Sequence, residues 1–167
     1  TWLSSPEASL TFSVLWRFSG SPARMSGLSL AVGIGLARAL GGLGASGVRL
    51  KWPNDVLLAV NGDFAKLAGI LVELASDRRG TQAIIGIGLN LLPPAVELPQ
   101  PAAGLAQALV HLPDCHAVLA SVLAARSASW AILRMPTIVT SSPSRRTAAW
   151  PKGSVRSSSS GTSPRIP

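Results

Sequence analysis

The string Lys-Trp-Pro-Asn-Asp-Val at residues 51–56 combines a cationic side chain with a turn that would fix its position. Pro53 cannot donate a ladder hydrogen bond, so the pattern predicts that a strand stops directly after Lys51. Asn54 and Asp55 are residue types that bond the free backbone groups of a turn and hold it rigid. Ligands of open α/β sheets bind beyond strand ends, so Lys51 would offer a fixed positive charge there. A solvent-exposed lysine above a simple turn would produce the same pattern, and the spacing alone leaves both interpretations open.

The string Gly-Ile-Gly-Leu-Asn at residues 86–90 places two glycines and an amide at alternate positions of an apolar run. In a strand, Gly86, Gly88 and Asn90 would share one face, because side chains alternate with a period of two. Missing side chains leave room for a flat ligand or for a closely packed backbone. The amide of Asn90 can donate and accept together, as the edge of a nucleotide base requires. Close packing of this strand on a helix, with Asn90 in a turn, is the favoured alternative when this string is considered alone.

Two other candidate sites carry less weight. Cys115 has His111 and His116 nearby as candidate bases, but a small apolar residue on a helix is the better interpretation. One cysteine and two histidines give neither an internal disulfide nor a predicted metal site. The glycines of Gly-Leu-Gly-Ala-Ser-Gly at 42–47 follow a predicted helix and precede a strand, whereas a dinucleotide-binding loop requires the reverse order. They are therefore expected to end the helix and to form a connector.

Hydrophobic periodicity predicts the elements that must position these residues. Asn61-Gly62 predicts a hairpin turn, because both residue types tolerate positive φ. Ser26 is expected to cap a helix, and Gly69 is expected to lie at a β-bulge. The prolines of residues 93–101 predict a loop. Strands are expected at 10–18, 48–52, 55–60, 66–74 and 82–91, and helices at 27–40, about 102–110 and about 114–125.

Composition divides the chain at about residue 125. Residues 1–125 carry eight Lys+Arg and seven Asp+Glu, whereas residues 126–167 carry seven Lys+Arg and no acid. The high isoelectric point therefore reflects the last quarter of the chain and does not indicate a nucleic-acid-binding domain. That segment holds 11 Ser and five Pro without an apolar period, which predicts disorder or the product of a shifted reading frame. The apolar run at 28–40 is too short to span a membrane and contains Arg38; with no signal peptide pattern at the N-terminus, a cytoplasmic location is expected.

Taken in order, the motifs resemble the biotin–protein ligase family. The pair Lys-Trp-Pro-Asn-Asp and Lys-Leu-Ala-Gly-Ile-Leu-Val-Glu at this spacing is the most specific part of the resemblance, which covers roughly residues 1–125. The matching strings are SLAVGIGLARAL at 29–40, VRLKWPNDV at 48–56, KLAGILVEL at 66–74 and IIGIGLN at 84–90. The resemblance implies an α+β fold with a mixed, largely antiparallel sheet and flanking helices, of the biotin/lipoate protein ligase kind and related to class II aminoacyl-tRNA synthetases.

The resemblance also implies an activity and a site. The family uses biotin and ATP with Mg²⁺ to make biotinyl-5′-AMP, and then transfers biotin to a lysine of the biotin carboxyl carrier domain of a carboxylase. Lys51 matches the family lysine that contacts the biotin carboxylate and the adenylate phosphate, and Lys66 is expected to matter less. Asn90 matches the asparagine that contacts adenine, and Gly86 and Gly88 match glycines that line the cleft. No metal-ligating protein residue is predicted.

Departures from the family pattern qualify the expected activity. The biotin-ring contacts and the Gly/Arg-rich loop of the family would lie upstream of Thr1, and the Ser/Arg-rich residues 126–167 do not resemble the family's small C-terminal β domain. Residues 1–125 are therefore expected to be part of a catalytic domain with weak or no activity alone. A lipoate–protein ligase-like transferase and a non-catalytic degenerate fragment are the alternatives. DNA would be a partner only if an N-terminal repressor domain preceded the chain.

Overall fold

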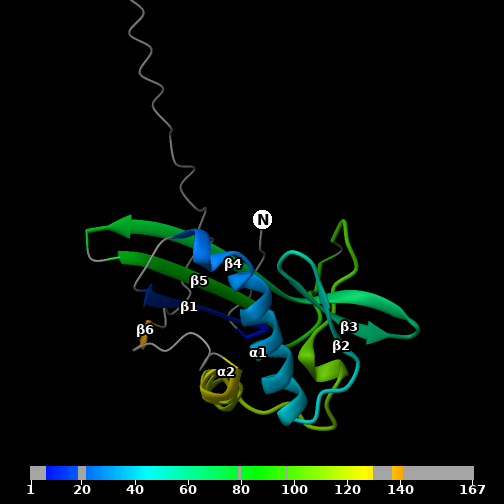
Figure 1. The fold of residues 1–167 in the computed structure, drawn as a ribbon. Helices are drawn as coiled ribbons and strands as arrows, with labels where there is room; N and C mark the ends of the chain where they lie inside the picture. Colours follow the sequence, from blue (N-terminus) through cyan, green and yellow to red (C-terminus); the bar gives the residue numbers. More distant parts are fainter. Residues whose placement is uncertain (1–6, 19–21, 79, 97, 130–136, 141–167) are drawn as a thin grey trace, which may run out of the picture.

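The computed structural model describes residues 7–18, 22–78, 80–96, 98–129 and 137–140. These residues form a single sheet and two α-helices, with two short 3₁₀ turns between them (Figure 1). The strands are β1 (Ser9–Phe18), β2 (Val48–Lys51), β3 (Asp55–Val60), β4 (Asp63–Asp77), β5 (Gly80–Asn90) and β6 (Thr137–Thr140). The helices are α1 (Leu28–Gly42) and α2 (Cys115–Ser129), and the 3₁₀ turns are η1 (Pro22–Met25) and η2 (Leu105–Gln107).

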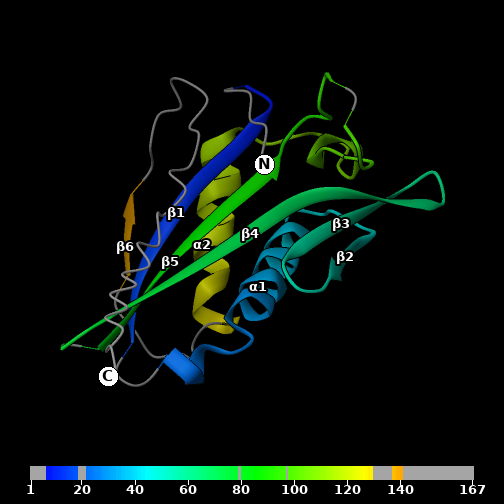
Figure 2. The ribbon, with the colours of Figure 1, turned by 90° about the horizontal axis from the view of Figure 1, so that it is seen from above.

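The sheet has the strand order β2-β3-β4-β5-β1-β6, and every pair of neighbouring strands is antiparallel. Hairpins join β2 to β3, β3 to β4 and β4 to β5, so three connections in succession are local (Figure 2). A single parallel bridge, between Lys66 and Ala102, lies outside the named strands. The expected α+β class with a largely antiparallel sheet is confirmed.

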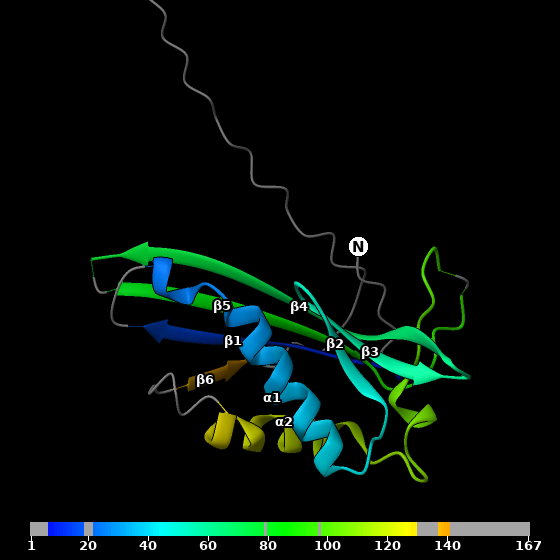
Figure 3. The same cartoon turned by 45° about the vertical axis from the view of Figure 1, so that its right-hand side comes forward.

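One face of the sheet carries the core, and the other carries no helix in the described part of the chain. Alternate residues are buried in β1 from Phe12 to Phe18 and in β5 from Thr81 to Ile87, as expected for strands with one covered face, and the last residues of β5 are buried on both faces. Leu36 and Leu40 of α1 and Val118 of α2 belong to the same core cluster. Figure 3 shows both helices below the sheet. The side of the sheet away from α1 and α2 is called the open face below.

Most predicted elements are present, with local differences. Asn61 and Gly62 both have positive φ, as the hairpin prediction requires. Helix α1 begins after Gly27, which is left-handed and gives no side-chain cap, so Ser26 is not the cap. The bulge lies where the β3 register shifts between Val56 and Leu57, and it does not lie at Gly69. The extra residue belongs to β4 and lies between the cross-strand partners of Val56 and Leu57.

The helix predicted at about 102–110 is only the 3₁₀ turn η2. Ala103 donates its backbone N–H to the carbonyl of Lys66, and the carbonyl of Pro101 accepts from the N–H of Lys66, so this stretch is held extended along β4. Gly104 packs so tightly on the backbone of Leu92 and Pro93 that a side chain there would not fit. These tertiary contacts override the local helical pattern.

Two expectations near the C-terminal part of the chain also differ from the structure. Cys115 lies on a helix as expected, but it is exposed in the first turn of α2 and is not a buried filler. Helix α2 continues through Ser129, beyond the boundary expected at residue 125. Residues 137–140, expected to be without structure, form β6 beside β1, which suits their β-branched sequence Thr-Ile-Val-Thr. Residues 130–136 and 141–167 lie outside the described residues.

Candidate functional site

The open face has a strip without side chains across its two central strands. Gly69 of β4 and Gly88 of β5 are direct cross-strand partners, and Gly86 lies two residues farther along β5 on the same face. The space over Gly86 is not filled by the protein, because an added Cβ would approach Leu71 and Ser13 no closer than 3.8 Å. That is ordinary van der Waals contact, so neither packing nor a positive φ explains this glycine. At Gly86 a flat group can therefore lie against the backbone of the sheet.

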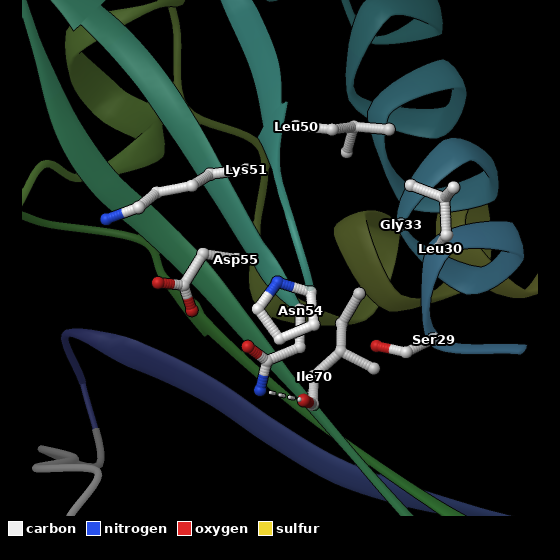
Figure 4. Close-up of a pocket in the computed structure, with 9 residues that line it drawn as sticks. Ser29, Leu30, Gly33, Leu50, Lys51, Asn54, Asp55 and Ile70 are labelled. Carbon is white, nitrogen blue, oxygen red and sulfur yellow. Dashed lines mark hydrogen bonds between the residues drawn. The ribbon is translucent and has the colours of Figure 1, made fainter. Parts of the chain in front are cut away.

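Lys51 reaches the same face from the end of β2. It is the cross-strand partner of Asp55, and Asp55 is the partner of Gly69, so the register puts these three positions on one side of the sheet. Figure 4 shows the Lys51 and Asp55 side chains extending away from α1. Lys51 is exposed, and the described residues offer it no ion pair. The predicted location of Lys51 at a strand end is confirmed, and its role remains a prediction.

A second lysine, Lys66 of β4, lies nearer the middle of the open face. Its Nζ is 2.6 Å from Oδ1 of Asp55, and the side chains are only 24% and 16% exposed. The carboxylate of Asp55 holds this ammonium in place, in contrast to that of Lys51. From the sequence, Lys66 is expected to matter less than Lys51. The signal that could have identified it is its place at the start of the specific Leu-Ala-Gly-Ile-Leu string.

Asn90, at the end of β5, links the open face to the loop that follows. Its Nδ2 donates to the carbonyl of Ala103 at 3.1 Å and to that of Lys66 at 3.4 Å, and the residue is only 6% exposed. The same Lys66 backbone bonds Pro101 and Ala103, so one amide fastens the loop and β4 together. Both N–H groups of the amide are therefore engaged. The sequence predicts that the Asn90 amide both donates to and accepts from a ligand, but only its Oδ1 is left to a ligand, as an acceptor.

A small pocket lies on the opposite side of β2, between the first turns of α1 and the β2–β3 turn (Figure 4). Leu30, Gly33, Leu50 and Ile70 give it mainly apolar walls. The Oγ of Ser29 is buried there without a hydrogen-bond partner in the described part of the protein. The pocket and the open face thus meet at the Lys51–Asp55 turn, which contributes to both.

The β2–β3 turn is fixed by hydrogen bonds to β4. Asn54 donates from Nδ2 to the carbonyl of Ile70 at 2.9 Å, and its own carbonyl accepts from the Ile70 N–H at 2.9 Å. This confirms the rigid turn predicted from the Pro-Asn-Asp sequence. These hydrogen bonds therefore also fix the position of the Lys51 backbone.

Other chemistry is sparse in the described ranges. They contain no group of three or more His, Cys, Asp or Glu side chains that could hold a metal ion. They also contain no helix long and apolar enough to cross a membrane. Cys115 Sγ lies 3.6 Å from Nδ1 of His116, but both side chains are exposed to solvent at the start of α2.

Comparisons with known proteins agree with this arrangement. Residues 1–90 match the model of the biotin/lipoate A/B protein ligase family. The chain is 45% identical over 97 residues to the bifunctional ligase/repressor BirA of Escherichia coli, an alignment that covers 58% of this chain and 29% of that protein. It is 34% identical over 126 residues to the biotin–[acetyl-CoA-carboxylase] ligase of Mycobacterium tuberculosis, covering 73% of this chain and 44% of the relative.

Solved structures give the same result for the fold. The biotin protein ligase from Aquifex aeolicus in complex with biotin and ATP superposes with a TM-score of 0.56 at 31% identity, covering 77% of this chain and 52% of that one. A biotin protein ligase-like protein from Silicibacter has a TM-score of 0.57 at 22% identity and supports the fold alone. The chain spans less than half the length of the curated relatives it matches and about half of the solved structures.

Proposed function

This chain belongs to the biotin/lipoate A/B protein ligase family as a biotin protein ligase member, and from that premise we propose that its open face binds biotinyl-5′-AMP. The proposed activity is the ATP-dependent activation of biotin and its transfer to a lysine of the biotin carboxyl carrier domain of a carboxylase, in the cytoplasm. The observation that carries the proposal is the side-chain-free strip of Gly69, Gly86 and Gly88 with two lysines beside it and an acceptor oxygen at its end.

The two lysines have different electrostatic roles in this proposal. In the first step a biotin carboxylate oxygen attacks the α-phosphorus of ATP and pyrophosphate leaves. Negative charge grows on the phosphoryl oxygens, and a cation that is already fixed stabilises it most, because it does not reorganise during the reaction. Lys66 is held by Asp55 at 2.6 Å and supplies that cation, while the exposed Lys51 neutralises the ligand at the rim.

Asn90 and the glycines account for recognition of the nucleotide. The strip at Gly86 and Gly88 accepts a flat ring against the backbone. The free Oδ1 of Asn90 accepts a hydrogen bond, and the exocyclic amine of adenine is a donor, whereas guanine presents a carbonyl at the equivalent position. In the second step the amine of the target lysine attacks the acyl carbon, AMP leaves with the bonding electrons, and the amine loses a proton.

Mg²⁺ belongs to this proposal only as a partner of the ATP phosphates. Magnesium is usually bound by one or two carboxylates together with substrate phosphates, so a dedicated protein cage is not required. Asp55, the carboxylate beside Lys51 and Lys66 on the open face, is engaged by Lys66, so the ion would be held chiefly through the ATP phosphates. The ion would supply charge neutralisation of the phosphates.

Direct binding tests the proposal. Isothermal titration of the purified chain with a non-hydrolysable biotinyl-5′-adenylate analogue should give saturable binding. A lipoyl-adenylate analogue serves as the matched competitor, and tighter binding of that analogue would favour a lipoate ligase-like transferase. If Gly86→Val binds the analogue as well as the unaltered chain, the ligand does not lie on the open face.

A further inference from the structure

The β2–β3 turn presents a large aromatic side chain that does not pack in the core. Trp52 is 81% exposed and is the most exposed aromatic residue in the described part of the chain. Burying an indole contributes more than burying most other side chains, and Trp is enriched among the residues that dominate protein interfaces. An exposed indole on a loose loop would need no explanation, but this turn is not loose.

Three contacts hold the turn on both sides of Trp52. The Lys51–Asp55 cross-strand pair closes it, and Asn54 exchanges two hydrogen bonds with Ile70 of β4, both at 2.9 Å. The indole is therefore carried by a backbone that is already ordered. Little conformational entropy would be lost when a partner covers it, which is the condition under which an exposed aromatic anchor contributes most to affinity.

The position of Trp52 relates it to the chemistry proposed above. It follows Lys51 directly, so the two Cα atoms are about 3.8 Å apart. A protein whose lysine reaches an acyl group held near Lys51 brings its surface to this turn, where Trp52 is the next residue in the chain. Small substrates need no such anchor, because they fit on the glycine strip itself.

The charges around the turn indicate the chemistry of that partner. Arg49 and Lys51 are exposed cations on β2, and neither forms an ion pair within the described ranges. The nearest carboxylate, Asp55, is already engaged by Lys66. The surface beside the indole is thus positively charged, which favours an acidic partner and speeds its encounter.

We infer that Trp52, flanked by Arg49 and Lys51, is the anchor on which an acidic protein segment carrying the target lysine docks. This inference rests on the proposed function for the identity of the partner. It adds a protein-binding residue that touches the second substrate and not the adenylate. Loss of the indole therefore weakens the complex with the carrier and leaves the binding of the adenylate unchanged.

The test uses the full 167-residue chain and a purified biotin carboxyl carrier domain whose target lysine is unmodified. Trp52→Ala should raise the Kd for the carrier domain at least about tenfold, in the range of an interface anchor. Phe64→Ala is the matched control, because Phe64 is the other strongly exposed aromatic (54%) and lies at the β3–β4 hairpin, at the opposite end of β3 from the Lys51–Asp55 turn; its Kd should stay within about twofold. Arg49→Gln should weaken binding at low salt and matter less at high salt.

The adenylate analogue separates this inference from the proposed function. Trp52→Ala should bind the analogue with the same affinity and melt at the same temperature as the unaltered chain. A carrier-domain Kd unchanged by Trp52→Ala, or equal losses for carrier and analogue, would overturn the inference. Absence of carrier binding to the unaltered chain would overturn it too. Failure of the chain to bind the analogue, with Trp52-dependent carrier binding intact, would instead overturn the proposed function.

Discussion

Replacing Lys66 by Met should cost more ligand affinity than the same replacement at Lys51. The sequence resemblance gives the larger role to Lys51, whereas the structure favours Lys66 on physical grounds. Lys66 is 24% exposed and held at 2.6 Å by Asp55, while Lys51 is exposed and unpaired within the described residues. Solvent screens an exposed charge, and a flexible side chain must be ordered before it binds.

The expected magnitudes follow from these environments. A charged hydrogen bond in a partly buried site contributes about 1.5–3 kcal/mol net, so Lys66→Met should weaken binding of the adenylate analogue roughly 10- to 150-fold. An exposed ion pair contributes about 0.2–1 kcal/mol, so Lys51→Met should weaken binding less than about sixfold. Lys66→Met also leaves Asp55 without its cation at 16% exposure, which should lower the free energy of unfolding by about 1–3 kcal/mol.

Stability and affinity must be measured separately, by urea unfolding and by calorimetric titration with the analogue. The double variant Asp55→Asn, Lys66→Met removes both charges, so it should regain most of the stability and none of the affinity. Lys51→Met should unfold like the unaltered chain. If Lys51→Met loses a hundredfold in affinity while the stabilised double variant stays within threefold, the assignment of the fixed cation to Lys66 is refuted.

Three further outcomes are expected. Asn90→Asp removes the N–H donors that fasten two backbone carbonyls, so unfolding should become easier by about 1–3 kcal/mol in chemical denaturation; equal stability would show that the loop is held by other contacts. Gly86→Ala should unfold like the unaltered chain because its Cβ meets nothing closer than 3.8 Å, while the bulkier Gly86→Val should abolish analogue binding in the same titration. The pKa of Asp114 lies below its ordinary value because its carboxylate accepts the backbone N–H groups of residues 117 and 116, so it stabilises the fold above pH 3.8 and this contribution is lost as the pH falls through the lowered pKa. The stability difference between the unaltered chain and Asp114→Asn should shrink as the pH falls through the lowered pKa; a difference that grows toward acid would contradict a stabilising role of the Asp114 carboxylate.

Local sequence patterns predicted much of the fold. The alternation around Phe12 and the period of α1 predicted a strand and a helix that the structure contains, because a strand or helix with one covered face leaves that period in its sequence. Asn61-Gly62 predicted its hairpin because only a few residue types accept positive φ at both positions. The pattern failed at residues 102–110, where hydrogen bonds to Lys66 outweigh a weak helical preference.

Residue spacing by itself determined which glycines and which amide share a face, because strand geometry repeats every two residues whatever the strand packs against. It also determined that Lys51 stands at a strand end, because proline stops the ladder there. Only the tertiary structure decided that Lys66 lies beside Asp55, that Asn90 donates its N–H groups to the loop and to β4, and that the indole of Trp52 stays in solvent. The contacts of Lys66 and Asn90 join residues 11 to 24 positions apart, and the exposure of Trp52 depends on what covers the turn. Strand register and burial are properties of the assembled sheet, so no single segment encodes them.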